Sequence, residues 1–198
     1  MKLELGNTEL KINVSFAAAV TLMLILDESG VCAVALLCCI VHELGHIMCL
    51  LVMGEQPKLI ELSFYGIKLE RRQTAGIKSI AEIAVYASGP AVNLIFSAAL
   101  FLISEAVQGM KTAAVISLGV GLFNLIPCRP LDGGNILFAA ICRHADEEKS
   151  ERICRMISAS FLLLIGIAGC RLLIKNKNFT LLGVGIYLAA ALLFDKNK

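Results

Sequence analysis

Two histidines and a glutamate, arranged as His42-Glu43-x-x-His46, are the residues of this chain whose types and spacing best suit chemistry. Residues four apart lie one above the other on a helix, so His42 and His46 can both turn an imidazole nitrogen toward one metal ion. Glu43 then lies beside the metal, where its carboxylate can take a proton from a water on Zn²⁺. The spacing therefore predicts two zinc ligands and a general base on one helix.

The surroundings of this motif are apolar. Glu43 is the only charged residue between Val31 and Met53, and two of the three histidines of the chain lie in the motif. A charge at the centre of a membrane helix costs about 2.5–3.5 kcal/mol on insertion scales, so such groups tend to mark function. The alternative is a pair of neutral core histidines hydrogen-bonded within a helix bundle, which leaves Glu43 unexplained.

The composition places the chain in a lipid bilayer. Of its 198 residues, 58% are hydrophobic and 17% are charged, whereas soluble domains are about 45–50% apolar and about 25% charged. A net charge of +2 gives no argument for a nucleic-acid partner. The eight cysteines include no C-x-x-C pair, which argues against a cysteine zinc site and favours buried thiols.

Six apolar segments predict an all-α membrane protein, a polytopic bundle of about six transmembrane helices. We expect residues 1–198 to form a single membrane-embedded domain, with core motifs at about 30–140 and C-terminal helices at about 156–193. The charged stretch from His144 to Arg155 predicts a solvated helix face or loop, with His144 as a surface histidine. The six segments are Ile12–Leu26, Val31–Met53, Ile80–Ile103, Thr112–Ile126, Met156–Ile174 and Phe179–Leu193.

Between the second and third apolar segments the hydrophobic period changes to two. From Lys58 to Arg71, apolar and polar residues alternate on both sides of Tyr65-Gly66, which predicts a small membrane-associated β-hairpin. One interpretation is a hairpin that lies on the bilayer surface. The other is an open edge strand to which an extended substrate can add.

The third apolar segment contains Gly89-Pro90 and, one turn later, Asn93. A proline within a helix removes a hydrogen bond, and membrane helices tolerate this where neighbours satisfy the freed carbonyl. Small and amide residues also commonly hold membrane helices together. These residues alone therefore favour a packing role for Gly89, Pro90 and Asn93 over a catalytic one.

After the fourth apolar segment, two prolines, Pro127 and Pro130, are followed by Asp132 and two glycines. Such a sequence does not continue a regular helix, and broken backbone at membrane depth must be buried in protein or line a wet cavity. A catalytic zinc usually has three protein ligands and one open position. Asp132 is therefore the candidate third ligand, and the alternative is a helix N-cap at the membrane surface.

Lysine and arginine placement predicts the orientation. With the N-terminus inside, fourteen of the 18 basic residues fall on inner segments and four on outer ones, which is the positive-inside bias. Both termini are then cytoplasmic. His46 lies about 10 Å from the cytoplasmic end of its helix, at 1.5 Å per residue, so we expect the site near the cytoplasmic face.

Three motifs occur in order along the chain: His42-Glu43-Leu44-Gly45-His46, then Ser88-Gly89-Pro90-Ala91-Val92-Asn93, then Asn124-Leu125-Ile126-Pro127 with Pro130-Leu131-Asp132-Gly133-Gly134. Together they resemble the site-2 protease family of intramembrane zinc metalloproteases, over about residues 30–140. The short length and six expected spans look most similar to the sporulation branch, the stage IV sporulation metalloprotease that activates a membrane-associated pro-sigma factor. Cys128 and Arg129 depart from the small or apolar residues more usual between the two prolines.

The resemblance implies that His42, His46 and Asp132 hold Zn²⁺ and that Glu43 is the general base. It implies that the residue matching Asn124 steadies substrate backbone near the scissile bond. It also places Gly89, Pro90, Asn93 and Pro127 beside the substrate, and it supports strand addition at the hairpin. The implied partners are a membrane-associated protein substrate, the lipid bilayer and, as an open option, a membrane regulatory protein.

The resulting hypothesis is regulated intramembrane proteolysis, the hydrolysis of a peptide bond in or near a transmembrane segment. One rival is a metal transporter with the same ligands, which predicts polar residues along a path across both leaflets, although the outer halves of the segments are nearly all apolar. The other rival is a catalytically silent membrane scaffold, which would normally have lost a ligand or the base.

Overall fold

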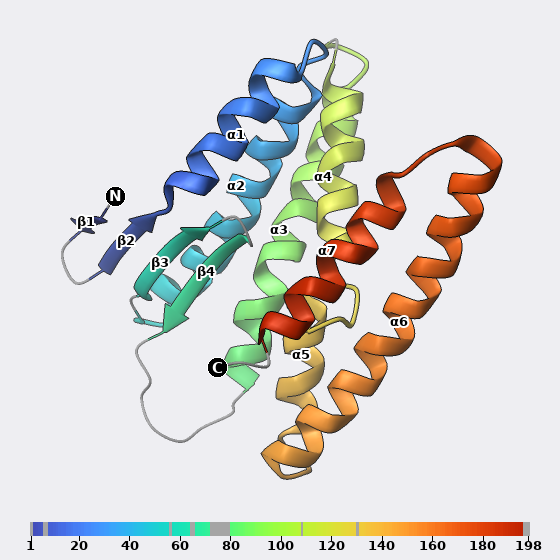
Figure 1. Cartoon of the computed structure of the whole chain (residues 1–198). Coiled ribbons are helices and arrows are strands. Elements are labelled where there is room, and N and C mark those ends of the chain that lie inside the picture. Colours follow the sequence, from blue (N-terminus) through green and yellow to red (C-terminus); the bar gives the residue numbers. More distant parts are fainter. Residues whose placement is uncertain are drawn as a thin grey trace. The chain divides into compact units, whose positions relative to one another are not determined.

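The computed structural model describes residues 2–5, 8–55, 57–63, 66–71, 80–107, 109–129 and 131–195, and Figure 1 shows the chain. The strands are β1 (Lys2–Leu5), β2 (Thr8–Ile12), β3 (Pro57–Ser63) and β4 (Gly66–Arg71). The helices are α1 (Val14–Leu26), α2 (Val31–Val52), α3 (Ile80–Ile103), α4 (Met110–Asn124), α5 (Asp132–Ile141), α6 (Glu147–Asn176) and α7 (Thr180–Asp195).

The described residues divide into two compact units. The first unit holds the four strands, α1, α2, α3 from Ser88 onward and α4 up to Leu122. The second holds the start of α3 up to Ala87, the connection from Phe123 to α5, and α5, α6 and α7. His42 and His46 therefore belong to the first unit and Asp132 to the second.

The four strands form one sheet in the order β1-β2-β3-β4. β3 and β4 pair antiparallel, with Ile60 opposite Leu69. Of the expected Tyr65-Gly66 turn, Tyr65 lies outside the described residues. β2 pairs parallel with β3, and α1 and α2 make the crossover between them. β1 and β2 were not predicted, because strands of four and five residues are stabilised by pairing with a partner rather than by their own sequence.

Three helices, α2, α3 and α6, are long and apolar enough to cross a membrane, and Phe16–Leu26, Met110–Asn124 and Thr180–Leu192 are shorter apolar helical segments. Many of their large apolar side chains face outward; Val52, Leu102 and Ile174 are each more than four-fifths exposed. Outward apolar surface on this scale suits a lipid environment.

The helix boundaries differ from the expected ones in two informative places. The charged residues 147–155 form the first turns of α6, ahead of its apolar part, since Glu147 and Glu148 favour a helix N-terminus. The residues after Pro130 form a separate ten-residue helix, α5. α4 ends at Asn124, so the fourth apolar helix is interrupted before Pro127 as expected, and α5 starts at Asp132, directly before two glycines.

Small residues hold the helices of each unit close together. In the first unit, Ser97 Oγ donates a hydrogen bond to the carbonyl of Ala114 at 2.7 Å, which joins α3 to α4. In the second, a Cβ on Gly169 of α6 would lie 3.0 Å from the backbone of Leu182 in α7. The second unit also contains a buried cluster of Cys128, Leu131 and Leu188. Close backbone approach through small residues is the usual packing of membrane helices.

Candidate metal and active site

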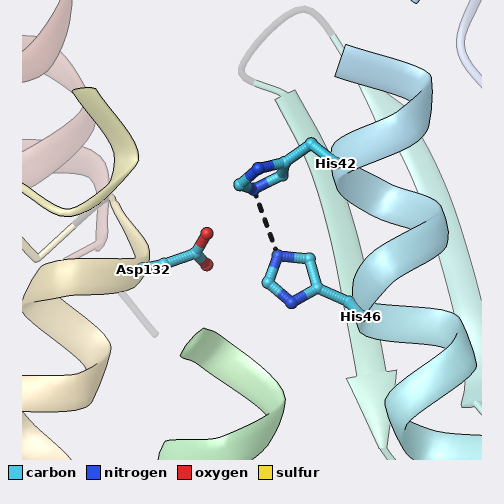
Figure 2. Close-up of side chains that lie close together, drawn as sticks. All are labelled: His42, His46 and Asp132. Carbon is cyan, nitrogen blue, oxygen red and sulfur yellow. Dashed lines mark hydrogen bonds between the residues drawn. The ribbon is translucent and has the colours of Figure 1, made fainter. Parts of the chain in front are cut away.

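His42 and His46 lie on one face of α2, four residues apart, and both are buried, with 4% and 7% of their surface exposed. Their Nε2 atoms are 3.2 Å apart, and the two rings are nearly perpendicular at 83°. Figure 2 shows both imidazoles turned to the same side of the helix, with the dashed line between their nitrogens. The helical spacing thus produces the paired orientation that the sequence predicts.

The distance between these nitrogens fits a single metal ion. Two nitrogens that bind one tetrahedral zinc at about 2.0–2.1 Å are held about 3.3 Å apart by the tetrahedral angle. The observed separation of 3.2 Å is close to this value. The pair therefore has the geometry of two ligands of one ion.

Ser88 of α3 lies against the far nitrogen of His46, with its Oγ 3.5 Å from His46 Nδ1. When Nδ1 donates its hydrogen to this hydroxyl, Nε2 keeps its lone pair for a metal. In the sequence, Ser88 stands out only as the first residue of the Ser88–Asn93 motif, and nothing there links it to His46. A serine directly before Gly89 carries no further signal, because the contact depends on how α2 and α3 pack.

Two glycines allow this packing. A Cβ on Gly45 of α2 would lie 2.9 Å from the carbonyl oxygen of Ser88, so the two helices touch through backbone there. A Cβ on Gly89 of α3 would overlap His46 Nε2 and lie 2.9 Å from His42 Cε1. Gly89 therefore lies directly against both imidazoles. Gly45 could have been suspected from the sequence, since a glycine inside a membrane helix often marks a helix contact.

Pro90 and Asn93 occupy the next turn of α3, against α4. Pro90 lies inside the continuous helix, and both residues are almost completely buried. Ser117 Oγ of α4 donates a hydrogen bond to the carbonyl of Asn93 at 3.0 Å, and a Cβ on Gly121 would lie 3.2 Å from Pro90 O. Among the described residues, the side-chain amide of Asn93 has no hydrogen-bond partner on either atom. The backbone of Asn93 thus takes part in the contact between α3 and α4, while its side-chain amide can still form hydrogen bonds.

Asp132 is the first residue of α5, and Leu131 is the N-cap, so the carboxylate lies within the first helical turn rather than capping it. A negative charge is favoured there by the helix dipole, which suits a ligand that must be ionised. Asn124 is the last residue of α4, and Pro127 follows in the connection; both are half-buried. Pro130 lies outside the described residues.

The remaining acidic residue of the motif, Glu43, and the third histidine, His144, differ in their exposure. Glu43 is half-buried in α2 between the two histidines, and His144 is exposed, as expected for a surface histidine. Among the described residues, His42, His46 and Asp132 make up the one group of three His, Cys, Asp or Glu side chains that could hold a metal ion, and Figure 2 draws them. Two imidazoles and a carboxylate are a donor set that zinc accepts.

The fold is that of a site-2 protease. The solved structure of the site-2 protease from Methanocaldococcus jannaschii matches with a TM-score of 0.70 and 23% sequence identity, over 95% of this chain and 91% of that one. Together with the long apolar helices, this supports an integral membrane protein.

The sequence comparisons find proteins that this chain resembles. The model of peptidase family M50 matches residues 104–165. A putative zinc metalloprotease of Synechocystis is 29% identical over 75% of this chain and 42% of the relative. A zinc metalloprotease of Methanocaldococcus jannaschii is also 29% identical, over 76% and 45%, and stage IV sporulation protein FB of Bacillus subtilis is 27% identical, over 66% and 47%. The resemblance that the three motifs indicate is confirmed, and the chain spans less than half the length of these relatives.

Proposed function

We propose that this chain is an intramembrane zinc endopeptidase that hydrolyses a peptide bond in or near a membrane segment of its substrate. The observation that carries the proposal is the pair of Nε2 atoms 3.2 Å apart on an H-E-x-x-H helix that is otherwise apolar. Relatives named zinc metalloproteases support zinc as the metal.

In this proposal His42, His46 and Asp132 hold the ion. Bound Zn²⁺ supplies Lewis acidity, which polarises a peptide carbonyl and makes water a nucleophile near neutral pH. Glu43 takes the proton from the attacking water and passes it to the leaving amine, a role that needs a carboxylate beside the metal rather than on it. The half-buried position of Glu43 in α2 leaves it accessible for this transfer.

We assign substrate contacts to Asn124, Asn93, Pro127, Gly89 and Pro90. The amide of Asn93 can donate to and accept from an extended peptide, because neither of its polar atoms has a partner among the described residues. Gly89 leaves room beside the imidazoles, where a larger side chain would occupy the space. A peptide bond must leave its helix to be attacked, and in this proposal these residues receive the unwound segment.

The sheet gives a second place for an extended substrate. β4 is an edge strand, paired only with β3 within the described sheet. An edge strand offers a row of backbone donors and acceptors to which a peptide can add as a further strand. We therefore propose that β4 helps to hold the substrate extended.

For the arrangement in the membrane we propose six crossing segments, with both termini in the cytoplasm and the site near the cytoplasmic face. The three shorter apolar helices would complete the six. The fourteen-to-four bias of lysine and arginine supports this orientation. Water then reaches the site from the cytoplasmic side.

For the substrate we propose a membrane-associated protein. The similarity to stage IV sporulation protein FB makes a membrane-associated pro-sigma factor the first one to test. A membrane protein that holds the enzyme inactive until a signal arrives would fit the same setting.

Cleavage of a membrane-tethered reporter library in liposomes tests the proposal, with bound zinc measured in parallel. Glu43→Gln should lower the cleavage rate by about 10²–10⁴-fold and keep stoichiometric zinc. A chelator should abolish cleavage in the natural chain. Full activity of Glu43→Gln would show that the role of Glu43 is wrong. Zinc flux into the liposomes without any cleavage would favour a transporter, and bound zinc with neither flux nor cleavage would favour a scaffold.

A further inference from the structure

Arg129 lies in the connection between α4 and α5, three residues before Asp132. Its side chain is mostly buried, with 19% of its surface exposed. A guanidinium that is mostly buried needs hydrogen-bonding or charged partners, and the structure provides them.

The guanidinium contacts two helices at once. Nη1 donates a hydrogen bond to Asn135 Oδ1 of α5 at 2.8 Å, and Nη2 lies 3.5 Å from Glu151 Oε2 of α6. Its Cζ lies 4.4 Å from the centre of the Phe138 ring. Asn135 and Phe138 are three residues apart on α5, so the side chain covers one face of this helix. The planar guanidinium can serve a carbonyl oxygen, a carboxylate and an aromatic face together, which an ammonium group cannot.

The backbone of Arg129 is also fixed. Its amide N–H donates a hydrogen bond to Ser158 Oγ of α6 at 3.0 Å, and Ser158 is 1% exposed. Ser158 and Glu151 lie two turns apart on α6, so the residue is held to this helix at two points. Backbone and side chain together join the α4–α5 connection to α6.

The connection itself is tightly closed onto α5. The amide of Leu131 donates to the carbonyl of Cys128 at 2.8 Å, and the amide of Asn135 donates to the carbonyl of Leu131 at 3.2 Å. A Cβ on Gly134 would overlap the carbonyl of Cys128 and lie 2.5 Å from the nitrogen of Arg129. Hydrogen bonds and close glycine contacts therefore tie Leu131 and Gly134, the residues on either side of Asp132, to Cys128 and Arg129.

We propose that Arg129 is a positioning residue for Asp132, through its contacts with Asn135, Phe138 and Glu151. The inference rests on the proposed function, because it takes Asp132 as a zinc ligand. Arg129 does not touch the metal or the substrate in this scheme. It fixes the connection to α5 and α6, so that the carboxylate of Asp132 starts α5 in one orientation.

Zinc affinity distinguishes a role of Arg129 in positioning Asp132 from a role in stabilising the fold alone. Groups that orient a metal ligand typically change metal affinity by about 10–100-fold when they are replaced. We expect Arg129→Gln to weaken zinc binding by at least about 10-fold, measured by competition with a chelator on the full chain in detergent. Arg129→Lys should recover part of this loss, and kcat should fall with KM unchanged.

Glu151 offers an independent test, since it leaves the α4–α5 connection untouched. Glu151→Gln should weaken zinc binding in the natural chain but have little further effect in Arg129→Gln, because coupled residues are not additive. Arg152→Gln is the matched control. It removes an Arg–Glu pair from the same helix, to Glu148 at 3.6 Å, but both side chains are more than three-quarters exposed. We expect it to leave zinc affinity unchanged.

The thermal midpoint of each metal-free variant completes the experiment. A lowered midpoint with zinc affinity and kcat within twofold of the natural chain would overturn the positioning role and leave a structural one. If Arg129→Gln does not fold, Arg129→Lys and Glu151→Gln decide the question by the same measurements. A folded natural chain that binds no zinc would refute the proposed function and this inference together, whereas normal zinc binding in every variant refutes the inference alone.

Discussion

α2 and the α4–α5 connection each carry proposed zinc ligands, but they hold them in different ways. α2 is an uninterrupted helix, and the orientation of His42 and His46 follows from their spacing of four. Asp132, the first residue of α5, follows a break in the helix, and hydrogen bonds and glycine contacts hold the backbone on either side of it. One region positions its ligands by helical periodicity and the other by tertiary contacts.

The two regions also differ in the polarity of the groups that hold them in place. α2 approaches α3 through the backbone of Gly45, and its histidines are surrounded by apolar helices. The connection is held by an arginine, an amide and a carboxylate. At membrane depth, a regular helix forms all of its backbone hydrogen bonds internally. Where a helix is interrupted, polar side chains or turns must supply partners for the freed N–H and C=O groups. Charged side chains therefore hold the interrupted region, whereas α2 and α3 touch through backbone.

The largest effect is expected at Gly89→Ala, which tests whether α2 positions its histidines alone or needs room on α3. The new Cβ would overlap His46 Nε2 and crowd His42 Cε1, and neither the helix backbone nor a buried imidazole can move far. Zinc affinity should fall by about 100-fold, the upper end of the range for residues that orient ligands. Chelator competition measures it.

Gly119→Ala is the control for this variant, because a Cβ at Gly119 of α4 meets nothing within 4 Å. Alanine is also the better helix former, so the control should be neutral or slightly stabilising. Unchanged zinc binding in Gly89→Ala would mean that the histidines can rotate away, and that α2 alone determines the site.

The second-largest effect is expected at Gly134→Ala, which tests whether the α4–α5 connection also needs room for its close backbone contacts. The added methyl group would overlap the carbonyl of Cys128, and such overpacking typically costs about 1–3 kcal/mol. The thermal midpoint should fall, and zinc affinity with it. Gly166→Ala in α6 is the matched control, since a Cβ there meets nothing within 4 Å. A normal midpoint would show that the connection is more adaptable than α2.

The same contrast explains which parts could be predicted from the sequence. His42, Glu43 and His46 are adjacent on one helix, so their spacing alone predicted their arrangement. The helix break before Asp132 was predicted from the prolines, but α5 was not, because its first turn depends on Gly133 and Gly134 fitting against carbonyls of the connection. Local sequence predicts that a helix stops, and tertiary contacts decide which element comes next.

Long-range contacts account for the remaining omissions. Ser88 touches His46 from 42 residues away, and Arg129 bonds Ser158 from 29 residues away. No local pattern contains such pairs. β2 was missed for the same reason, since its five residues are held by a parallel partner more than 40 residues later. The apolar segments themselves were predictable because a run of apolar residues is visible in the local sequence, and among the described residues three of them form helices long and apolar enough to cross a membrane.

Two neighbouring polar residues of α3 give a smaller and more discriminating test. Among the described residues, the fully buried amide of Asn93 has no hydrogen-bond partner, whereas Ser97, one turn later, donates a hydrogen bond to the carbonyl of Ala114. A buried group without a partner costs about 1–3 kcal/mol, and a satisfied hydrogen bond contributes about 0.5–1.5 kcal/mol. Asn93→Leu, which is similar in shape, should raise the free energy of unfolding and lower kcat/KM. Ser97→Ala should lower the free energy of unfolding and leave kcat/KM unchanged.

Denaturation in detergent and reporter cleavage measure the two quantities. A loss of stability in Asn93→Leu, with cleavage intact, would mean that the amide has a packing role only. It would also mean that the region around the histidines contains no polar group reserved for substrate.

The smallest effect is expected for a substitution of Asp27, just before α2. This substitution tests whether α2 needs contacts at its start to orient its histidines. The Asp27 carboxylate accepts hydrogen bonds from Ser29 Oγ at 2.6 Å and from the amide of Cys32 at 2.7 Å. These bonds, that of the Ser29 side chain above all, lower the pKa of Asp27 from its ordinary value of 3.8. Since the pKa is lower in the folded chain, the contribution to stability is complete above pH 3.8 and is lost as the pH falls through the lowered pKa.

Asp27→Asn should therefore lower the thermal midpoint slightly at neutral pH, and the difference from the natural chain should shrink as the pH falls below 3.8. The neighbouring variant Glu28→Gln is a matched control, since it also removes a charge from this turn, and it should leave the thermal midpoint at neutral pH nearly unchanged. Zinc affinity should be unchanged in both, because α2 orients its histidines by periodicity more than two turns from this end. A change in zinc affinity in Asp27→Asn would instead show that α2 must be anchored at its start to present His42 and His46, as the α4–α5 connection must be anchored to present Asp132.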